Sequence, residues 1–494
     1  MKKIIIIGAG LAGLSAGVYA RQSGFDVTIY ESHSIPGGAS TSWRRKGYYF
    51  EGGLQWLTGS SSQTQLNKLW REVGALDDTI EIRNRDPFFL YEEDGKQACL
   101  YRDIETLRTK WTQLSPEDRQ EIDKLCSDVK KFTKLQMPAM DLPKLKAKYP
   151  VKVSMKMMFS MLPALPRMQY YQNFSAKEYS EKFRCPQIRN LLANMIGEEY
   201  NAAGVLLTIA TLAAGDGGYP KGGSLAMAGR MAKNFESLGG VIRYQTPVEK
   251  VVVENGAVTG VIIAGERIPA DAVIVTRDTL SAIDTLFDDP IREPWAEKMR
   301  AETVPATNVF VGLGVEADLS DLPGSATFPV KEPIQVGDLS YHAIGFNNYA
   351  GFTGYAPEGC TAVTTALMGD SYDFWKQCYG NGTYDAEKQK VAEAVIHALE
   401  EKYPHIAGKT TVWDVATPLT YERYLGSYRG SWMSVMKKGQ ANVQYPCKLE
   451  TISNLYFAGQ RLVSPGGCPV ALTTGRTAVQ QLCLDTDTVF QGNY

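Results

Sequence analysis

Hydrophobic and polar positions near the start of the chain follow two different periodicities. Residues 3–7 form a short apolar run, a helix-length segment spans residues 14–21, and a second strand-like run at residues 26–30 ends at Glu31. Short apolar runs bounded by turn residues are typical of buried strands, whereas longer segments after them are typical of helices. The pattern therefore predicts a strand, a helix and a second strand, as in a βαβ unit.

Strand patterns return in the middle of the chain and again near its end. Residues 248–253, 258–263 and 271–276 are rich in valine and isoleucine, and Asn255-Gly256 between the first two is typical of a hairpin turn. Residues 454–484 have the pattern of a strand, a glycine turn and a helix. Strand patterns like those of residues 3–30 thus occur in two further parts of the chain.

Composition narrows the class of protein. The 494 residues allow two or three domains, and a net charge of −2 argues against a nucleic-acid binder. The eight cysteines are scattered, with no CxxC pair or His/Cys cluster, so neither a metal site nor a dithiol site is expected. A reduced, cytoplasmic setting is the simplest expectation. No apolar run of ~18 residues occurs, and no transmembrane helix is predicted.

A glycine motif of the form GxGxxG occupies residues 8–13, between the first predicted strand and helix. Gly8 allows a tight turn, Gly10 lets the backbone approach a pyrophosphate, and Gly13 permits close packing of the helix on the strand. The amides and dipole of the helix start favour phosphate. Glu31 is placed to accept hydrogen bonds from ribose hydroxyls. No arginine follows it, so no 2′-phosphate is expected.

The cofactor is narrowed to FAD by the glycine pair at Gly37 and Gly38. Gly37 follows Glu31 by six residues, a spacing that resembles the flavoprotein pattern of an acid, five residues and Gly-Gly. In such proteins the turn runs along the pyrophosphate and the ribityl chain. No second strand–GxGxxG–helix unit occurs after residue 100. We therefore predict FAD without a dedicated pyridine-nucleotide domain.

These patterns predict an α/β fold whose core is a discontinuous Rossmann-like FAD-binding domain, and its acid-and-Gly-Gly spacing resembles that of the glutathione-reductase/amine-oxidase type. Residues 1–100, 216–280 and 436–494 are expected to form this domain. Residues 101–215 are expected to form a helical segment that faces the substrate or a membrane. An inserted α+β substrate-binding domain is expected at residues 281–435.

Three motif blocks are spread over the whole chain. They are PGGASTSW (36–43) with GYYFEGGLQWLTG (47–59), YPKGGS (219–224) with TPV (246–248), and YFAGQ (456–460) with PGGCP (465–469). Together they resemble the phytoene-desaturase-like flavoproteins, which include carotenoid desaturases, carotenoid cis–trans isomerases and retinol saturases. The resemblance implies an FAD-dependent oxidoreductase acting on C=C or C–C bonds of an apolar polyene, isoprenoid or fatty-acid-like substrate. Desaturation, saturation and isomerisation stay open.

The resemblance also implies which residues contact FAD. Val248 would contact the adenine, Gly459 and Gln460 the pyrophosphate and ribityl chain, and the amides of residues 467–470 the flavin N1–C2=O edge. A helix start at that place would also stabilise the anionic reduced flavin on physical grounds. The full set of expected cofactor contacts is Gly8, Gly10, Leu11, Ala12, Gly13, Glu31, Gly37, Gly38, Ala39, Ser40, Val248, Gly459, Gln460, Gly467, Cys468, Pro469 and Val470.

Four residues are candidates to contact the substrate or the reacting part of the flavin: Gln55, Trp56, Arg423 and Tyr428. Gln55 stands where related enzymes often have histidine, and Glu51 where they often have aspartate. Because the glutamine side chain does not titrate, no catalytic acid or base is identified at position 55. Ordinary packing explains Arg423 and Tyr428 equally well.

A basic, methionine-rich segment lies in the helical region. Residues 130–167 contain nine Lys or Arg, one acid and six methionines, and a peripheral membrane contact is expected through residues 130–168. Lysines would meet anionic headgroups while methionine, Phe159 and Leu162 enter below them. A solvated helical face over a methionine-rich core explains the composition equally well.

Two other functions stay open. One is an amine-oxidase-like enzyme, which predicts an aromatic cage around an amine and often a lysine near flavin N5; no such lysine is assigned. The other is a non-catalytic, membrane-associated flavin-binding protein. An apolar small molecule is the expected partner, and the electron donor or acceptor is not identified.

Overall fold

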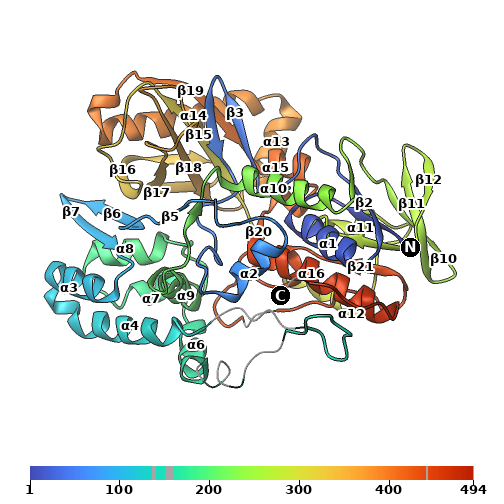
Figure 1. Ribbon diagram of the computed structural model, residues 1–494. Helices are drawn as coiled ribbons and strands as arrows, with labels where there is room; N and C mark the ends of the chain where they lie inside the picture. Colours follow the sequence, from blue (N-terminus) through green and yellow to red (C-terminus); the bar gives the residue numbers. More distant parts are fainter. Residues whose placement is uncertain (136–140, 152–154, 156–158, 160, 441–442, 493–494) are drawn as a thin grey trace.

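A five-stranded parallel sheet carries the amino-terminal βαβ unit in the computed structural model (Figure 1). The structure describes residues 1–135, 141–151, 155, 159, 161–440 and 443–492. Ile4 to Ile7 are all buried, as expected of a parallel sheet that is covered on both faces. The strands, in spatial order, are β21 (Leu455–Phe457), β13 (Ala272–Val275), β1 (Lys3–Ile7), β2 (Asp26–Tyr30) and β9 (Val241–Arg243).

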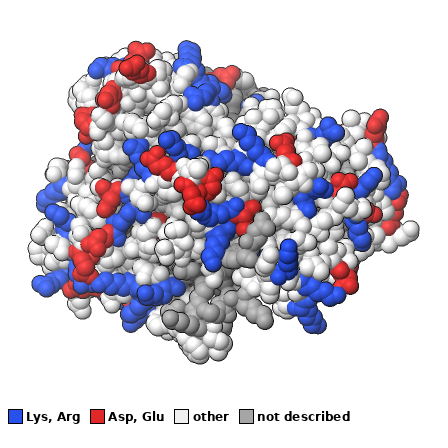
Figure 2. All heavy atoms as spheres, in the orientation of Figure 1, with Lys and Arg blue, Asp and Glu red and all other residues white. Residues whose placement is uncertain are grey.

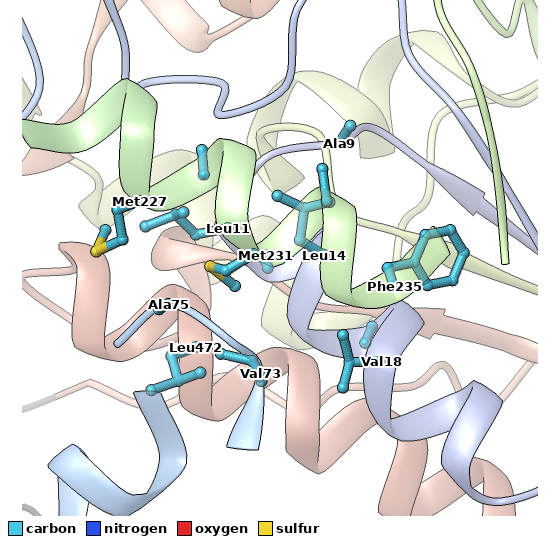
Figure 3. Packing of buried hydrophobic residues seen from close by; sticks show 14 of the residues in the cluster. Ala9, Leu11, Leu14, Val18, Val73, Ala75, Met227, Met231, Phe235 and Leu472 are labelled. Carbon is cyan, nitrogen blue, oxygen red and sulfur yellow. The ribbon is translucent and has the colours of Figure 1, made fainter. Parts of the chain in front are cut away.

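Three helices pack together on one face of this sheet: α1 (Leu11–Gln22) lies between α10 (Gly223–Ser237) and α16 (Cys468–Asp485). Figure 3 shows side chains of α1 packed against Met227, Met231 and Phe235 of α10. Glycine permits the close approach on the other side of α1, because a Cβ on Gly475 would lie 2.5 Å from the carbonyl oxygen of Ala12.

The opposite face of the sheet is covered by a small antiparallel sheet and two helices. Asn255 and Gly256 both have positive φ, at 51° and 72°, which is the backbone of a type I′ hairpin turn. The predicted turn is therefore confirmed. The covering elements are β10 (Lys250–Glu254), β11 (Ala257–Ile263), β12 (Glu266–Pro269), α11 (Thr279–Thr285) and α12 (Pro294–Glu302).

A second, seven-stranded sheet forms the other half of the molecule, with α13 (Tyr372–Asn381) and α14 (Tyr384–Lys402) packed near it (Figure 1). In spatial order its strands are β19 (Thr410–Ala416), β15 (Asn308–Val315), β18 (Thr361–Met368), β17 (Leu339–Asn348), β16 (Ser325–Val336), β6 (Phe89–Glu93) and β7 (Lys96–Leu100).

The position of β6 and β7 differs from the expected domain boundary at residue 100. These strands fall within the predicted nucleotide-binding piece 1–100, yet β6 pairs in parallel with β16 and β7 forms the outer edge of the seven-stranded sheet. The pairing joins residues more than 200 positions apart, as between Tyr91 and Thr327. A local hydrophobic pattern does not encode which distant strand is the neighbour.

The segment between β7 and α10 is helical, as predicted, and has its own buried core. Within the described residues, none of the helices combines the length and the apolar character that crossing a bilayer requires. The helices are α3 (Ile104–Leu114), α4 (Arg119–Phe132), α6 (Leu165–Gln172), α7 (Ala176–Ser180), α8 (Pro186–Asn194) and α9 (Ala202–Ala213).

Short elements connect these three parts. The β3–β4 hairpin packs against β15, β18 and β19 of the seven-stranded sheet, and α15 follows the edge strand β19. Their bounds are β3 (Ser42–Arg45), β4 (Tyr48–Glu51), α2 (Gln65–Glu72), β5 (Ile82–Arg83), β8 (Tyr219–Pro220), β14 (Pro305–Ala306), α15 (Pro418–Leu425), β20 (Met433–Ser434) and the 3₁₀ turns η4 (Tyr428–Gly430) and η5 (Gln460–Leu462).

Replacing Gly13 by alanine is expected to lower the thermal unfolding midpoint strongly. The new Cβ would lie 1.9 Å from the carbonyl oxygen of Gly8, and separating α1 from β1 costs about 1–3 kcal/mol or more. The matched control is Gly229→Ala in α10, where nothing lies within 4 Å of the new Cβ; it should stabilise by up to about 1 kcal/mol. Equal midpoints for the two variants would contradict the role of Gly13.

Candidate functional site

A cavity of about 1760 Å³ joins the carboxyl ends of the parallel strands to one face of the seven-stranded sheet. Ligands of open α/β sheets bind at this edge of the strands. Pockets for one drug-sized ligand are typically about 300–1,000 Å³. The cavity is therefore large enough for a dinucleotide and a second molecule.

The nucleotide end of the cavity is formed by the turn from β1 into α1. Gly8 has a φ of +105°, and the hydroxyl of Thr276 donates hydrogen bonds to the carbonyls of Ile7 and Gly8, at 2.8 and 3.0 Å. The amides of Leu11 and Ala12 have no hydrogen-bond partner among the described residues. The turn is thus rigid, and its unpaired donors fit a pyrophosphate.

Glu31 lies at the end of β2 and lines the same cavity. Its side chain is buried, with Oε2 accepting a hydrogen bond from the amide of Ala9 at 2.6 Å and Oε1 accepting one from the amide of His33 at 2.8 Å. These two bonds leave carboxylate lone pairs for ribose hydroxyls. Val248 lines the cavity at this end, together with Pro247.

The turn at Gly37 and Gly38 packs directly over the β1–α1 turn. The amide of Gly37 donates to the carbonyl of Ala9 at 2.9 Å, and a Cβ on Gly38 would lie 3.2 Å from the Cα of Gly10. Ala39 and Ser40 continue along the cavity wall. The two predicted glycine motifs therefore meet, as a ligand that runs from ribose to flavin requires.

The start of α16 faces the cavity from the opposite wall. Gly467 precedes the helix with a φ of +94°, and its amide is 3.4 Å from Oε1 of Gln460. The amides of Cys468 and Val470 have no hydrogen-bond partner among the described residues. Pro469 was expected among the amide donors, but proline has no N–H; its side chain lines the wall instead.

The thiol of Cys468 is not suited to nucleophilic chemistry. Burial raises the pKa of Cys468 to about 12, and the negative charge of Glu51 adds to the rise. The thiol therefore stays protonated near neutral pH.

Glu51 forms a buried hydrogen-bonding centre that the sequence did not identify. Its carboxylate accepts hydrogen bonds from the amides of Gly53 and Leu54, from the hydroxyl of Tyr219, and from the amide and hydroxyl of Ser224. Burial and the charge of Glu51 raise the pKa of Tyr219 well above its usual value, so the phenol remains a donor. This centre holds the loop that carries Gln55 and Trp56.

A buried ion pair between Arg461 and Asp278 was also missed. Their atoms are 2.5 Å apart, and both side chains are almost fully buried. Arg461 also donates to the hydroxyls of Ser431 and Ser434, so it ties η5 to β20. In the sequence, the signal for this ion pair was a charged residue directly after Gly459 and Gln460. No sequence pattern identified its partner Asp278, which is distant along the chain.

The four candidate catalytic residues are not brought together. Gln55 and Trp56 line the cavity, with Trp56 packed edge-on against Phe88. Arg423 also lines it but lies toward the nucleotide end, since it stacks on Tyr424, whose ring contacts His33 beside Glu31.

Two predicted residues lie away from the cavity wall as far as the described residues define it. Tyr428 is 38% exposed on η4 and is not among the lining residues. Its neighbour Arg429 has a φ of +51° and pairs with Asp370 and Asp373, which fixes the turn at the surface. Gly13 lies beneath the cavity and serves helix–strand packing, as its predicted role requires.

Comparisons with known proteins agree with this geometry. The model of the family "flavin containing amine oxidoreductase" matches residues 11–483. The chain is 24% identical to prolycopene isomerase of Daucus carota, over 97% of this chain and 80% of that protein. It is 23% identical to the lycopene-forming phytoene desaturase of Pseudescherichia vulneris, over 98% and 100%. A structure of putrescine oxidase bound to putrescine aligns with a TM-score of 0.62 at 17% identity, over 98% and 99%.

These matches confirm the predicted fold class, the FAD cofactor and the resemblance to phytoene-desaturase-like flavoproteins. The residues that the structure places around the cavity fit that cofactor, because unpaired backbone amides stand at both helix starts and a buried carboxylate stands at the end of β2.

Replacing Glu51 by glutamine is expected to lower the free energy of unfolding by about 2–4 kcal/mol. The carboxylate meets donors only, so an amide NH₂ in its place faces another donor. Thermal unfolding of the apoprotein measures the loss. The control is Glu266→Gln on an exposed strand, which should change the midpoint little. Equal midpoints for the two variants would show that Glu51 is not a structural centre.

Proposed function

The chain belongs to the family of flavin-containing amine oxidoreductases, and we propose that this FAD-dependent oxidoreductase acts on C=C or C–C bonds of an apolar polyene, isoprenoid or fatty-acid-like substrate. The net reaction within this class is a desaturation, a saturation or an isomerisation. The carotenoid-acting relatives support the substrate class.

The observation that carries the proposal is the lining of the cavity beyond the nucleotide end. There the wall includes apolar and aromatic side chains from the seven-stranded sheet and from the region of α8 and α9, beside polar ones such as Asn190, Thr208 and Thr327. A long apolar molecule buries its surface against the apolar part of this wall, with a gain of about 25 cal/mol per Å². The apolar and aromatic residues include Phe89, Tyr91, Leu191, Met195, Leu207 and Phe310.

The protein's contribution to the chemistry is positioning and electrostatics. When bound, FAD supplies the hydride-accepting or hydride-donating group. The unpaired amides at the start of α16 favour negative charge in front of that helix. Trp56, on the loop held by Glu51, contributes an apolar surface that excludes water. Gln55 lines the cavity and can donate or accept a hydrogen bond, but it moves no proton.

The amine-oxidase alternative has less support from the cavity wall. Among the described lining residues the lysine is Lys177, whose side chain is 60% exposed and pairs with Glu198 at 3.3 Å. It is therefore poorly placed to act beside a buried flavin. A non-catalytic flavin-binding protein remains the third alternative.

A peripheral membrane contact is proposed for the surface around α6. Met155, Phe159, Leu162 and Leu165 are all at least half exposed, and Leu162 and Leu165 lie at the start of a 3₁₀ turn and of α6 that follow one another directly. Figure 2 shows Lys and Arg side chains along the lower edge of the molecule, where α4 lies. Exposed apolar side chains beside basic ones suit an anionic lipid surface.

The structure describes only some of the residues on which the sequence-based prediction of this membrane contact rests. Outside the described residues lie Met137, Met140, Lys152, Lys156, Met157 and Met158.

Anaerobic mixing of the holoprotein with candidate substrates tests the proposed reaction class. A carotenoid precursor with saturated bonds, or its cis isomer, should bleach the oxidised flavin or be converted to its trans isomer by prereduced enzyme. Primary amines should leave the flavin oxidised. A conjugated polyene that reoxidises the prereduced flavin indicates saturation. Bleaching by an amine alone favours the amine-oxidase alternative, and no change in any of these mixtures favours the binding protein.

Flotation with anionic vesicles tests the membrane contact. The wild-type protein should float with vesicles that contain phosphatidylglycerol, and the double variant Leu162→Glu/Leu165→Glu should lose most of this binding because two charges must enter the interface. Tyr379→Glu is the matched control, since Tyr379 is 71% exposed on α13, away from this surface. Absence of wild-type binding would exclude the proposal.

A further inference from the structure

The cavity contains one partly buried arginine that lacks a carboxylate partner among the described residues. The Lys and Arg side chains that line the described wall have different surroundings: Lys177 pairs with Glu198, Arg461 pairs with Asp278, and Arg423 is exposed over Tyr424. Arg277 is the remaining one. No carboxylate of the described chain lies within 4.0 Å of its guanidinium, because the adjacent Asp278 is turned toward Arg461.

The guanidinium of Arg277 makes fewer hydrogen bonds than it can donate. Its Nη2 donates to the hydroxyl of Ser281 at 3.0 Å, and its Nε is buried with no partner. Burial lowers the pKa of Arg277, and the charge of Asp278 opposes this effect. Because arginine stays charged at every ordinary pH, the apoprotein carries a partly desolvated cation, and the binding of an anion there offsets the cost of its burial.

Arg277 stands beside the phosphate-binding turn. It follows β13 directly, and its amide nitrogen lies 3.7 Å from the position that a Cβ of Gly8 would take. On the other side, Gly426 ends α15 with a φ of +60°, and a Cβ there would lie 2.9 Å from Nε of Arg277. The glycine therefore leaves space for the guanidinium, and the negative end of the α15 dipole is adjacent to it.

The end of α15 also reaches the ribose side of the cavity. Tyr424 makes an edge-on contact with His33, with ring centroids 5.2 Å apart, and His33 donates its amide to Glu31. The inserted domain thus covers the nucleotide end of the cavity. Arg277 lies beneath this cover and next to the turn of Gly8.

We propose that Arg277 provides the positive side chain that neutralises the pyrophosphate of bound FAD. The two glycine motifs at residues 8–13 and 37–38 offer phosphate only backbone amides and a helix dipole. A guanidinium adds a full charge and planar donors that match phosphate oxygens. The observation behind the proposal is a partly buried cation, with a buried unpaired Nε and no carboxylate partner among the described residues, in the same cavity as the glycine motifs.

The test measures flavin binding by the apoprotein, and the quenching of flavin fluorescence reports the binding. Arg277→Met should raise the Kd for FAD about 10- to 100-fold, as expected for loss of a hydrogen bond to a charged group, and should weaken the salt dependence of binding. The affinity for riboflavin, which has no phosphate, should stay within about twofold. Arg277→Lys should recover part of the FAD affinity, because it restores the charge without the planar fork.

Thermal stability of the apoprotein separates this role from a structural one. Removal of a partly buried cation that lacks a counter-ion should leave the midpoint of Arg277→Met unchanged or higher, whereas loss of a structural contact lowers it. Arg119→Met is the matched control, since Arg119 is 75% exposed on α4, and it should not affect FAD affinity. Unchanged FAD affinity in Arg277→Met, or an equal loss for FAD and riboflavin with a lower midpoint, would overturn the proposal.

A double-mutant cycle with Gly426 adds a second check. Gly426→Ala forces the guanidinium to move and should weaken FAD binding in the wild-type background. In the Arg277→Met background the same change should have little further effect on the FAD affinity, because the two residues act through one contact. Additive losses would contradict the proposed coupling.

Discussion

The approach of α1 to β1 is the constraint on which the rest of the structure depends. Gly13 leaves no room for even a methyl group against the carbonyl of Gly8, so the helix starts directly at the end of the central strand. This contact decides where the unpaired amides of the helix start are located, and hence where phosphate can bind. Thr276 fixes the same turn from the neighbouring strand. The close packing of α1 against β1 thus makes the βαβ unit a phosphate-binding site.

The position of the second helix start follows from the first. Gly475 lets α16 lie against the backbone of α1 at Ala12, and the hydroxyl of Ser15 donates to the carbonyl of Leu472 at 2.8 Å. Close packing of these helices brings two positive helix ends to one cavity, although they are more than 450 residues apart in sequence. One serves the phosphates, and the other faces the part of the cavity that adjoins the apolar wall. A bound dinucleotide is long enough to extend from one helix start to the other.

Features that depend on local chemistry could be predicted from the sequence, and features that depend on distant pairing could not. The βαβ unit, the meeting of two glycine motifs and the Asn255-Gly256 turn follow from backbone requirements of neighbouring residues. The pairing of β6 with β16 does not, because an alternating strand fits several edges equally well. Glu51 and Arg277 were missed for the same reason: their roles come from groups that the fold brings to them. Tyr428 is the opposite case. A motif-like segment of the sequence predicted it near the substrate, whereas the η4 turn holds its side chain at the surface.

The distribution of satisfied charges divides the cavity into two chemical halves. Glu31, Glu51 and Asp278 are buried, and each accepts hydrogen bonds from the protein itself. They therefore fix the wall without demanding a cationic ligand, which argues against a site built for an amine. The nucleotide half has unpaired amides and the guanidinium of Arg277, and both are complementary to an anion. The other half combines apolar and aromatic groups such as Phe89, Leu207 and Phe310 with uncharged polar ones. A long apolar molecule buries surface against the former without placing a charge there, and the two halves meet in front of α16.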